Sequence, residues 1–283
     1  MSDILHQILE RKRWELDVLR DALRGNLRVP PDDPWFPGRD VLDRAAAALK
    51  RGGAEPTGRD FLGALRHDDR LAVIAELKRR SPSAGVIATW AEPSKLAAAY
   101  AEGGADAVSC LTDHAFFGGR PGFLPRAREV FPGPVLRKDF VTDVLDLAVS
   151  AALGADAVLL IVAALGPAET ARLVREARAF GLEPLVEVHD TRELDAAMVA
   201  GAAVVGVNNR DLRTFRVDLG TTERLAAQLP DAALLVGESG IRSPDDARRM
   251  RRAGCDAVLV GESLARAGGD GLAALQVEGP RAR

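Results

Sequence analysis

The sequence predicts an α/β fold, a (β/α)8 TIM barrel with an N-terminal helical extension. Three observations predict it: eight short apolar runs follow residue 70, helical patterns separate them, and one five-residue motif recurs at every second run. Strands that are apolar on both faces and alternate with helices are typical of parallel βαβ units. An open doubly wound sheet is the alternative, but the runs carry no glycine-rich dinucleotide fingerprint.

The first 70 residues lack this alternation. Residues 3–22 place apolar side chains at three- and four-residue spacings among charges, which predicts an amphipathic helix. Residues 24–40 hold four prolines and two glycines and therefore cannot form a continuous helix. Shorter helices are expected at about 40–50 and 59–66. We expect residues 1–70 to form a helical extension that caps the barrel and residues 71–283 to form the barrel, within a single structural domain.

The apolar runs are the predicted strands, and a repeat supports their number. They span residues 71–77, 107–111, 134–140, 157–162, 184–188, 204–209, 234–239 and 257–262. Gly104-Ala105-Asp106-Ala107-Val108 recurs from Gly154, again from Gly254 with one change, and in degenerate form from Gly201, at spacings of 50, 47 and 53 residues. We expect each glycine to end a helix in the left-handed conformation. A two-strand period over eight strands is typical of a barrel of duplicated units.

Composition excludes several classes of protein. The net charge is −3 and aromatic residues make up 5% of the chain, so no nucleic-acid-binding surface is expected. No run approaches 18 apolar residues, and the charged N-terminus is unlike a signal peptide, so no membrane partner is expected. The two cysteines, Cys110 and Cys255, cannot form a disulfide framework and are expected to be small core residues. A cytoplasmic location follows from this pattern.

In a barrel of this kind the active site lies at the C-terminal ends of the strands. Six of the predicted strands end in ionisable or amide side chains: Glu76 and Lys78; Lys138; Glu187 and His189; Asn208 and Arg210; Glu238; and Glu262. Buried charges must be paired, so their concentration at one end of the barrel indicates a site. The last two strands lead into Ser239-Gly240 and Gly261-Glu262, in the position where backbone N–H groups commonly hold a phosphate.

Two lysines and two glutamates point to acid–base chemistry. We expect burial to lower the pKa of Lys78 and Lys138 toward neutrality, so that one of them donates a proton, and to raise the pKa of Glu76 or Glu187. A ring of structural salt bridges is the alternative interpretation. His189 is a weaker catalytic candidate, since the helix start at Asp190 can draw it away from the site. No metal-ligand cluster, Ser-His-Asp elbow or P-loop is present in the sequence, so no metal is expected.

Seven segments together resemble the indole-3-glycerol phosphate synthase family. They are IAELKRRSPSAG (74–85), LTDHAFFGG (111–119), PVLRKDF (134–140), LVEVHD (185–190), GVNNRDL (206–212), ESGI (238–241) and VLVGESL (258–264). The resemblance implies a lyase of tryptophan biosynthesis that needs no cofactor. It closes the indole ring of 1-(o-carboxyphenylamino)-1-deoxyribulose 5-phosphate with loss of CO₂ and water.

The same resemblance implies roles for individual residues. Lys138 resembles the general acid, Glu187 the general base, and Lys78 the lysine that contacts the substrate carboxylate. Glu76, Asn208, Arg210 and Glu238 match residues that bind and orient the substrate; Ser81, Ser239, Gly240, Gly261 and Glu262 match the phosphate site; and Phe117, Phe140, Leu159 and Leu212 match the apolar walls around the anthranilate ring. Arg120 stands where the family commonly has serine.

Two other functions remain open at this point. A related phosphate-binding barrel, such as a phosphoribosylanthranilate isomerase, would not need paired lysines or an N-terminal extension. A barrel that binds a ligand without catalysis would not need a complete set of acid, base and carboxylate-binding residues. A small phosphorylated substrate is the expected partner in all cases, and we expect a monomer or weak homodimer.

The predicted position of the extension leads to a test by truncation. Deleting residues 1–40 is expected to raise KM for the substrate more than it impairs barrel folding, because the extension caps the mouth of the site. Steady-state kinetics and circular dichroism of the truncated chain measure the two effects. An unchanged KM would contradict the capping role.

Overall fold

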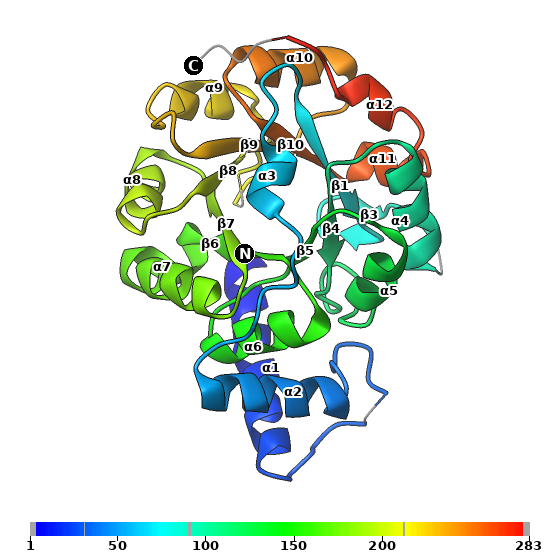
Figure 1. Ribbon diagram of the computed structural model, residues 1–283, viewed down its shortest axis with the longest axis vertical. Helices are drawn as coiled ribbons and strands as arrows, with labels where there is room; N and C mark the ends of the chain where they lie inside the picture. Colours follow the sequence, from blue (N-terminus) through cyan, green and yellow to red (C-terminus); the bar gives the residue numbers. More distant parts are fainter. Residues whose placement is uncertain (1–3, 31, 90–91, 212, 280–283) are drawn as a thin grey trace.

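The computed structural model describes residues 4–30, 32–89, 92–211 and 213–279. Eight parallel strands close into a barrel, in the spatial order β1-β10-β9-β8-β7-β6-β5-β4 (Figure 1). They are β1 (Ala72–Leu77), β4 (Ala107–Leu111), β5 (Val135–Lys138), β6 (Ala157–Ile161), β7 (Glu183–Val188), β8 (Val204–Asn208), β9 (Leu234–Glu238) and β10 (Ala257–Val260). Each lies within or beside its predicted run, so the predicted TIM barrel is confirmed.

Helices connect the strands and surround the barrel. They are α4 (Pro93–Glu102), α5 (Phe123–Val130), α6 (Val144–Leu153), α7 (Val162–Ala179), α8 (Thr191–Val199), α9 (Gly220–Ala226), α10 (Pro244–Arg252), α11 (Glu262–Arg266) and α12 (Leu272–Leu275). A two-residue hairpin of β2 (Arg80–Ser81) and β3 (Gly85–Val86) lies in the loop after β1. None of the described helices is long and apolar enough to cross a membrane.

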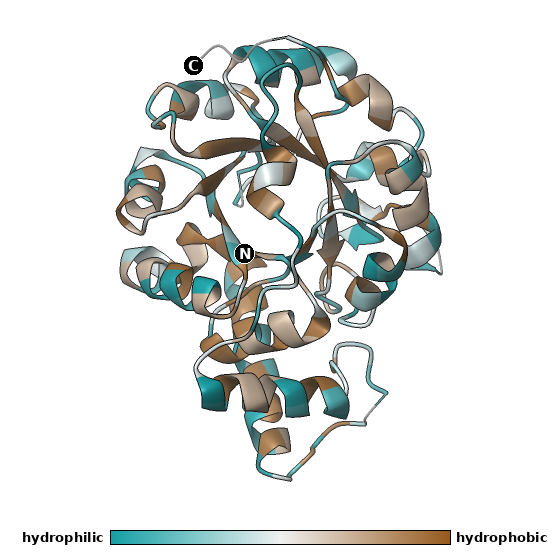
Figure 2. Ribbon diagram, in the orientation of Figure 1, coloured by the Kyte–Doolittle hydropathy of each residue, from teal (hydrophilic) through white to brown (hydrophobic). Residues whose placement is uncertain are grey.

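Apolar side chains form two layers, one inside the barrel and one between strands and helices. The interior layer includes Ile74, Leu136, Leu185 and Leu259, and the outer layer includes Val73 and Val186. Because successive strand residues point to opposite faces, each strand supplies side chains to both layers. The sequence of each strand is therefore apolar with little interruption. Figure 2 shows these strands as a predominantly hydrophobic ring with more polar helices around it. Cys110 and Cys255 are buried in the outer layer, as predicted.

The N-terminal segment contacts the barrel in three places. Helix α1 (Ile4–Leu23) runs across the C-terminal ends of the strands, where Ile4, Leu5 and Ile8 line the central cavity. Helix α2 (Arg39–Arg51) packs on α6 outside the barrel. Helix α3 (Phe61–Leu65) places Phe61 and Leu65 in the interior layer at the opposite end of the barrel. Figure 1 shows this helix over the middle of the ring of strands. The extension thus touches both ends of the barrel, and the division at residue 70 stays a proposal.

The proline-rich segment between α1 and α2 contains no helix among its described residues, as predicted. It still contributes to the core, because Trp35 and Phe36 are both buried. The Trp35 ring lies 5.3 Å from the Trp14 ring and 6.0 Å from the Phe36 ring. These aromatic contacts fix the irregular segment against α1.

The repeated motif has two structural roles. Gly104, Gly154, Gly201 and Gly254 all have positive φ, between 76° and 100°, as expected for residues that end a helix. The aspartates tie neighbouring strands together. The Oδ2 atoms of Asp106, Asp156 and Asp256 accept hydrogen bonds of 2.7–2.8 Å from the backbone N–H groups of Val73, Val135 and Leu235, respectively. Each aspartate therefore joins the strand that it precedes to the strand beside it in the barrel.

A buried ion cluster joins α1 to the strand that carries Lys138. The Lys12 ammonium lies 2.7 Å from Asp139 Oδ1, 2.9 Å from Glu15 Oε2 and 3.3 Å from Asp113 Oδ2. Asp139 also accepts from Arg137 at 2.9 Å. Burial opposes charge on Asp139, but Lys12 and Arg137 outweigh it and hold the pKa of Asp139 well below its ordinary value. We call Lys12, Glu15, Asp113, Asp139 and Arg137 the Lys12 cluster.

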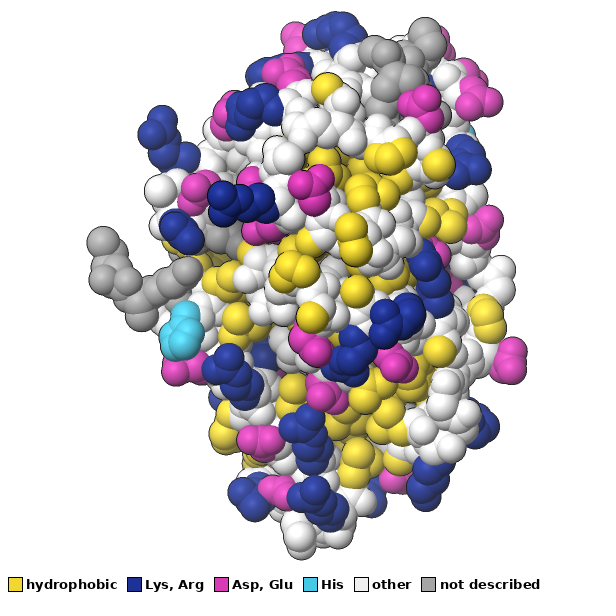
Figure 3. All heavy atoms as spheres, turned by 90° about the vertical axis from the view of Figure 1, so that its left-hand side faces the viewer, with side chains coloured by type: hydrophobic (Ala, Val, Ile, Leu, Met, Phe, Trp, Pro, Cys, Tyr) yellow, Lys and Arg dark blue, Asp and Glu magenta, His cyan; other side chains and the backbone are white. Residues whose placement is uncertain are grey.

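The outer surface is mixed in charge. Figure 3 shows one face of the molecule, on which Lys and Arg side chains are interspersed with Asp and Glu side chains. Many of these charges pair locally, for example Arg249 with Glu223 at 2.7 Å. Such exposed pairs contribute little to stability, whereas the buried Lys12 cluster is sensitive to the loss of one partner.

Removing the Lys12 charge is expected to destabilise the fold. Lys12→Met leaves Asp113 and Asp139 buried under α1 with less positive charge, which should lower the free energy of unfolding by about 3–5 kcal/mol. Urea unfolding of the variant measures this loss. Deleting the whole of α1 would instead expose these carboxylates to water, so the point substitution tests burial of charge specifically.

Lys50→Met is the matched control, because Lys50 is exposed in the last turn of α2. Its unfolding midpoint should stay close to that of the wild-type chain. Equal midpoints for the two variants would contradict the importance of the Lys12 cluster.

Candidate active site

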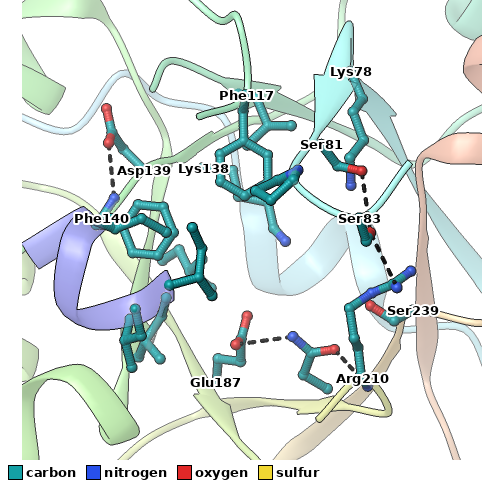
Figure 4. Close-up of a pocket in the computed structure, with 18 of the residues that line it drawn as sticks. Lys78, Ser81, Ser83, Phe117, Lys138, Asp139, Phe140, Glu187, Arg210 and Ser239 are labelled. Atoms are coloured by element: carbon teal, nitrogen blue, oxygen red, sulfur yellow. Dashed lines mark hydrogen bonds between the residues drawn. The ribbon is translucent and has the colours of Figure 1, made fainter. Parts of the chain in front are cut away.

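Five polar side chains line the mouth of the barrel because the strand alternation continues past the apolar interior. Four of them, Glu76, Lys138, Glu187 and Glu238, each follow an inward-facing apolar residue by two positions and so lie on the same face of the strand. The apolar residues are Ile74, Leu136, Leu185 and Val236. The fifth polar residue, Asn208, ends β8. The inward-facing positions thus change from apolar to charged at one level of the barrel. Figure 4 shows Lys78, Lys138 and Glu187 directed into the same cavity.

Lys138 lies among three carboxylates. Its ammonium is 3.3 Å from Glu238 Oε2 and 3.5 Å from Glu76 Oε1, and Glu187 also acts on it electrostatically. Burial alone would lower the pKa of Lys138, but the carboxylates outweigh burial and raise the pKa above its ordinary value. The expectation of a lysine pKa lowered toward neutrality was therefore wrong for Lys138, because sequence alone did not show how closely three carboxylates surround it.

Two of the carboxylates around Lys138 have pKa values that are shifted in opposite directions. Burial works against a charged Glu76, but Lys78 at 3.2 Å and Lys138 hold its pKa below the ordinary value. Burial raises the pKa of Glu238 to about 7, Lys138 opposes this rise, and Glu187 adds to it. Glu76 is therefore the ionised partner of both lysines, while Glu238 titrates near neutral pH.

Glycine on the neighbouring strands makes room for these side chains. A Cβ atom at Gly206 would stand 2.1 Å from Glu238 Oε1, and a Cβ atom at Gly261 would stand 2.1 Å from Glu76 Oε2. Any larger residue at either position would displace a carboxylate of the site. Gly261, predicted to bind phosphate, thus also has a packing role that the sequence did not suggest.

Glu187 is held by a hydrogen-bonded chain from neighbouring elements. Asn208 Nδ2 donates to Glu187 Oε1 at 3.1 Å, and Asn208 Oδ1 accepts from the backbone N–H of Arg210 at 3.0 Å. The Arg210 guanidinium reaches Ser83 Oγ, in the loop after β1, at 3.4 Å. Figure 4 shows this chain crossing the mouth from Glu187 to the hairpin loop. It fixes the carboxylate of Glu187 at the floor of the cavity.

One side of the cavity, which we call the apolar compartment, suits an aromatic ring. Phe117 and Phe140 lie there with ring centres 6.0 Å apart, and Leu159 and Ile8 complete the wall. Lys78 Nζ lies 5.8 Å from the centre of the Phe117 ring. A planar aromatic group seated between these side chains would have an ammonium group at its edge.

The other side, the polar compartment, suits an anion. Ser239, Gly240, Gly261, Ser263 and Arg242 are among the residues that line it. Ser239 and Gly240 have φ values of 63° and 88°, so the backbone turns sharply at the end of β9. The carboxylate of Glu262 pairs with Arg266 at 3.1 Å. Backbone N–H groups, Ser263 Oγ and arginine side chains are the anion-binding groups available here.

The two compartments join at a shared set of polar residues. Glu76, Lys78, Lys138, Arg210 and Ser239 line both. A molecule with an aromatic ring at one end and a phosphate at the other would therefore extend across Lys78 and Lys138. The two lysines thus lie where the apolar and the polar compartments meet.

The structure brings together nearly all the predicted site residues. The predicted residues that line one or both compartments are Glu76, Lys78, Ser81, Phe117, Lys138, Phe140, Leu159, Glu187, Asn208, Arg210, Glu238, Ser239, Gly240, Gly261 and Glu262. Ser81, expected to bind the substrate and its phosphate, lines the apolar compartment, where its hydroxyl accepts from Ala84 N–H at 3.1 Å. Leu212 lies outside the described residues.

Sequence reasoning missed several residues that line the cavity. Ile4, Leu5 and Ile8 come from α1, Phe215 from the loop after β8, and Arg242 and Arg266 from positions beyond the strand ends. The apolar face of α1 was visible in the sequence, but nothing in it fixed where that face docks. Within the described residues no group of three or more His, Cys, Asp and Glu side chains is arranged to hold a metal ion.

Comparison with known proteins identifies related sequences. Residues 41–274 match the family model described as indole-3-glycerol phosphate synthase. The chain is 52% identical over 233 residues to indole-3-glycerol phosphate synthase 2 of Streptomyces coelicolor, which covers 82% of this chain and 90% of that protein. It is 42% identical over 269 residues to indole-3-glycerol phosphate synthase of Dechloromonas aromatica, with 94% and 95% covered.

Solved structures of low sequence identity share the fold. A thiamine phosphate pyrophosphorylase from Pyrococcus furiosus superimposes with a TM-score of 0.55 at 18% identity, covering 76% of this chain and 96% of that one. A structure described as native KDPGal gives a TM-score of 0.53 at 17% identity, with 72% and 92% covered. At this identity the likeness concerns the barrel alone.

The raised pKa of Glu238 leads to a pH-dependent prediction for stability. The folded chain holds this proton more tightly than the unfolded chain, whose glutamate titrates near 4.5. The stability that the proton contributes is complete below pH 4.5 and is lost as the pH rises to about 7. Because glutamine does not titrate, the stability of Glu238→Gln does not fall in this way as the pH rises. Its unfolding free energy relative to wild type should rise between pH 4.5 and 7, by on the order of 1 kcal/mol or more, and level off above.

Urea unfolding at a series of pH values measures this difference. Glu129→Gln, at an exposed position at the end of α5, is the control and should give a difference that changes little with pH. A difference for Glu238→Gln that is flat across the same range would contradict the assignment of Glu238 as the group that titrates near neutrality.

Proposed function

This chain belongs to the indole-3-glycerol phosphate synthase family, and from that premise we infer that its barrel mouth carries out the synthase reaction of tryptophan biosynthesis. One observation carries the inference: an apolar and a polar compartment meet at Lys78 and Lys138. The substrate, 1-(o-carboxyphenylamino)-1-deoxyribulose 5-phosphate, has an aromatic ring at one end and a phosphate at the other. Its carbonyl carbon, which must bond to the ring, lies between them.

We propose that the compartments orient the substrate before any bond forms. The aryl ring lies between Phe117 and Phe140, and the phosphate lies at Ser239, Gly240 and Gly261. Lys78 Nζ lies over the Phe117 ring, beside the proposed aryl site, which suits it to the carboxylate of the substrate. Holding both ends brings the ring carbon close to the carbonyl carbon and removes much of the entropic cost of ring closure.

The proposed first steps use Lys138 as an acid. Its ammonium donates a proton to the carbonyl oxygen as the ring carbon attacks, so the new carbon–carbon bond forms without an isolated alkoxide. Loss of CO₂ then restores the aromatic ring. Glu76 contacts both lysines, and its charge helps to keep Lys138 protonated until the substrate takes a proton. Because these proposed steps release CO₂, the proposed activity is that of a carboxy-lyase.

The last step in the proposal is dehydration. The hydroxyl leaves as water with a proton from one of the lysines, and Glu187 removes a proton from the carbon that becomes part of the indole. Asn208 supports this role, because its hydrogen bond to Glu187 Oε1 aims the carboxylate into the cavity. Every step uses groups of the chain itself, and no cofactor enters the proposal.

The proposal also covers partner and location. A small phosphorylated molecule is the proposed ligand, and a monomer or weak homodimer in the cytoplasm is the proposed state. The site supports a monomer as the working unit, since both compartments are lined by residues of one chain. The decisive assay mixes the purified protein with the substrate and follows indole fluorescence. Phosphoribosylanthranilate serves as the comparison substrate, and conversion of that compound alone would favour the isomerase function.

Two substitutions test the assigned acid and base. Lys138→Ala and Glu187→Gln are each expected to lower kcat by roughly 10²–10⁴-fold, because each removes one partner in proton transfer. Circular dichroism should show that both variants keep the fold. Lys50→Ala, on the exposed face of α2, is the control and should retain wild-type turnover. Near-normal kcat in both site variants would overturn the assigned roles.

A further inference from the structure

A carboxylate stands among the residues of the polar compartment, where the phosphate of the substrate is proposed to bind. Glu262 directly follows Gly261 in the turn after β10, and both residues line this compartment. Like charges repel, so a carboxylate beside a phosphate weakens binding unless a cation offsets it. A phosphate held at Gly261 therefore needs a positive charge close to Glu262.

The two lysines of the site are already engaged with other carboxylates. Lys138 pairs with Glu76 and Glu238, and Lys78 pairs with Glu76. The arginines that line the polar compartment are Arg210, Arg242 and Arg266. Of these, Arg266 is bonded to Glu262 itself, which makes it the cation that can offset this carboxylate.

Arg266 lies one helical turn beyond Glu262 on α11. Its Nε donates to Glu262 Oε1 at 3.3 Å, and its Nη2 donates to the same oxygen at 3.1 Å. A guanidinium group has five N–H groups, so the pair uses two of them and three remain for another acceptor. Arg266 can therefore offset Glu262 and donate to a phosphate at the same time.

The pair is open to solution and adds little to the stability of the helix. The side chain of Glu262 is 38% exposed and that of Arg266 is 50% exposed. Exposed ion pairs four residues apart on a helix contribute only about 0.3–0.5 kcal/mol to stability. Support of α11 is thus a small part of what the pair can do, whereas its charges face a compartment that is proposed to bind an anion.

We propose that Arg266 makes the polar compartment specific for a phosphate group, an inference that rests on the proposed function. Arg266 offsets the charge of Glu262 and donates to the phosphate oxygens, and Arg242, from the loop between β9 and α10, adds a second positive charge. These three side chains together carry one net positive charge. Loss of Arg266 would reduce that charge to zero, although a phosphate monoester carries close to two negative charges at pH 7.

Binding of the reaction product tests the proposal without requiring turnover. Arg266→Met should raise the Kd for indole-3-glycerol phosphate about tenfold or more, because it removes a charge-assisted hydrogen bond and leaves Glu262 unopposed. Titration calorimetry measures this Kd. In steady-state kinetics the same variant should raise KM for the substrate more than it lowers kcat, since the phosphate lies away from the bonds that change.

Glu262→Gln separates the effect of charge from support of the helix. This variant should bind the product at least as tightly as the wild-type chain, because Arg266 then acts on the phosphate alone. The double variant Arg266→Met/Glu262→Gln should bind more tightly than Arg266→Met. If the pair served only α11, both single variants would weaken binding equally and the double variant would recover nothing. That result, or a Kd for Arg266→Met within twofold of wild type, would overturn the proposal.

Arg172→Met is the matched control. Arg172 pairs with Glu169 on α7 at 2.7 Å, and its side chain is 37% exposed. This variant should keep the wild-type Kd, and urea unfolding of both arginine variants should give midpoints close to wild type. A wild-type chain that binds the product but does not convert the substrate rejects the proposed function alone. An active wild-type chain whose variants do not follow the expected order of Kd rejects the role of Arg266 alone.

Discussion

The rest of this structure depends on how three buried carboxylates are accommodated around one ammonium group inside a closed barrel. Glu76, Glu187 and Glu238 are all buried and share the surroundings of Lys138. Such a group is stable only if each carboxylate is paired with a cation, protonated or hydrogen-bonded. Glu76 is paired with two lysines, Glu238 holds a proton near neutral pH, and Glu187 has Asn208 and His189. Glycine at 206 and 261 then follows from the space that these side chains occupy.

The Lys12 cluster extends the same constraint to the N-terminal helix. Asp139 follows Lys138 directly, and its carboxylate is fixed from one side by Arg137 and from the other by Lys12 of α1. The backbone that presents Lys138 is therefore held by a residue more than a hundred positions away in the chain. Docking of α1 supplies both this charge and the apolar side chains of Ile4, Leu5 and Ile8 that cover the cavity. One helix thus both lines the cavity and helps to hold the strand end that carries the proposed acid.

The fold could be predicted because its signals are local. Strand runs, the period of the Gly-Ala-Asp-Ala-Val motif and the left-handed glycines depend on neighbouring residues alone. The site could be located because strand ends of a barrel converge, so Lys78, Lys138 and Glu187 were recognisable without coordinates. The pKa direction of Lys138 was not, since it depends on the distances to Glu76 and Glu238 on other strands. The hydrogen bonds from strand backbone to Asp106, Asp156 and Asp256 were equally hidden, because both partners are known only once strands are paired.

Those aspartates have a consequence for how the barrel is assembled. Three pairs of adjacent strands, β1 with β4, β5 with β6, and β9 with β10, are each fastened at one end by a carboxylate. In the degenerate fourth copy of the motif Ala203 replaces the aspartate, and no such fastening can form between β7 and β8. That quarter of the barrel carries Glu187, His189 and Asn208. The strands that hold the proposed base are therefore joined without such a carboxylate, by their backbone ladder and by the hydrogen bond from Asn208 to Glu187.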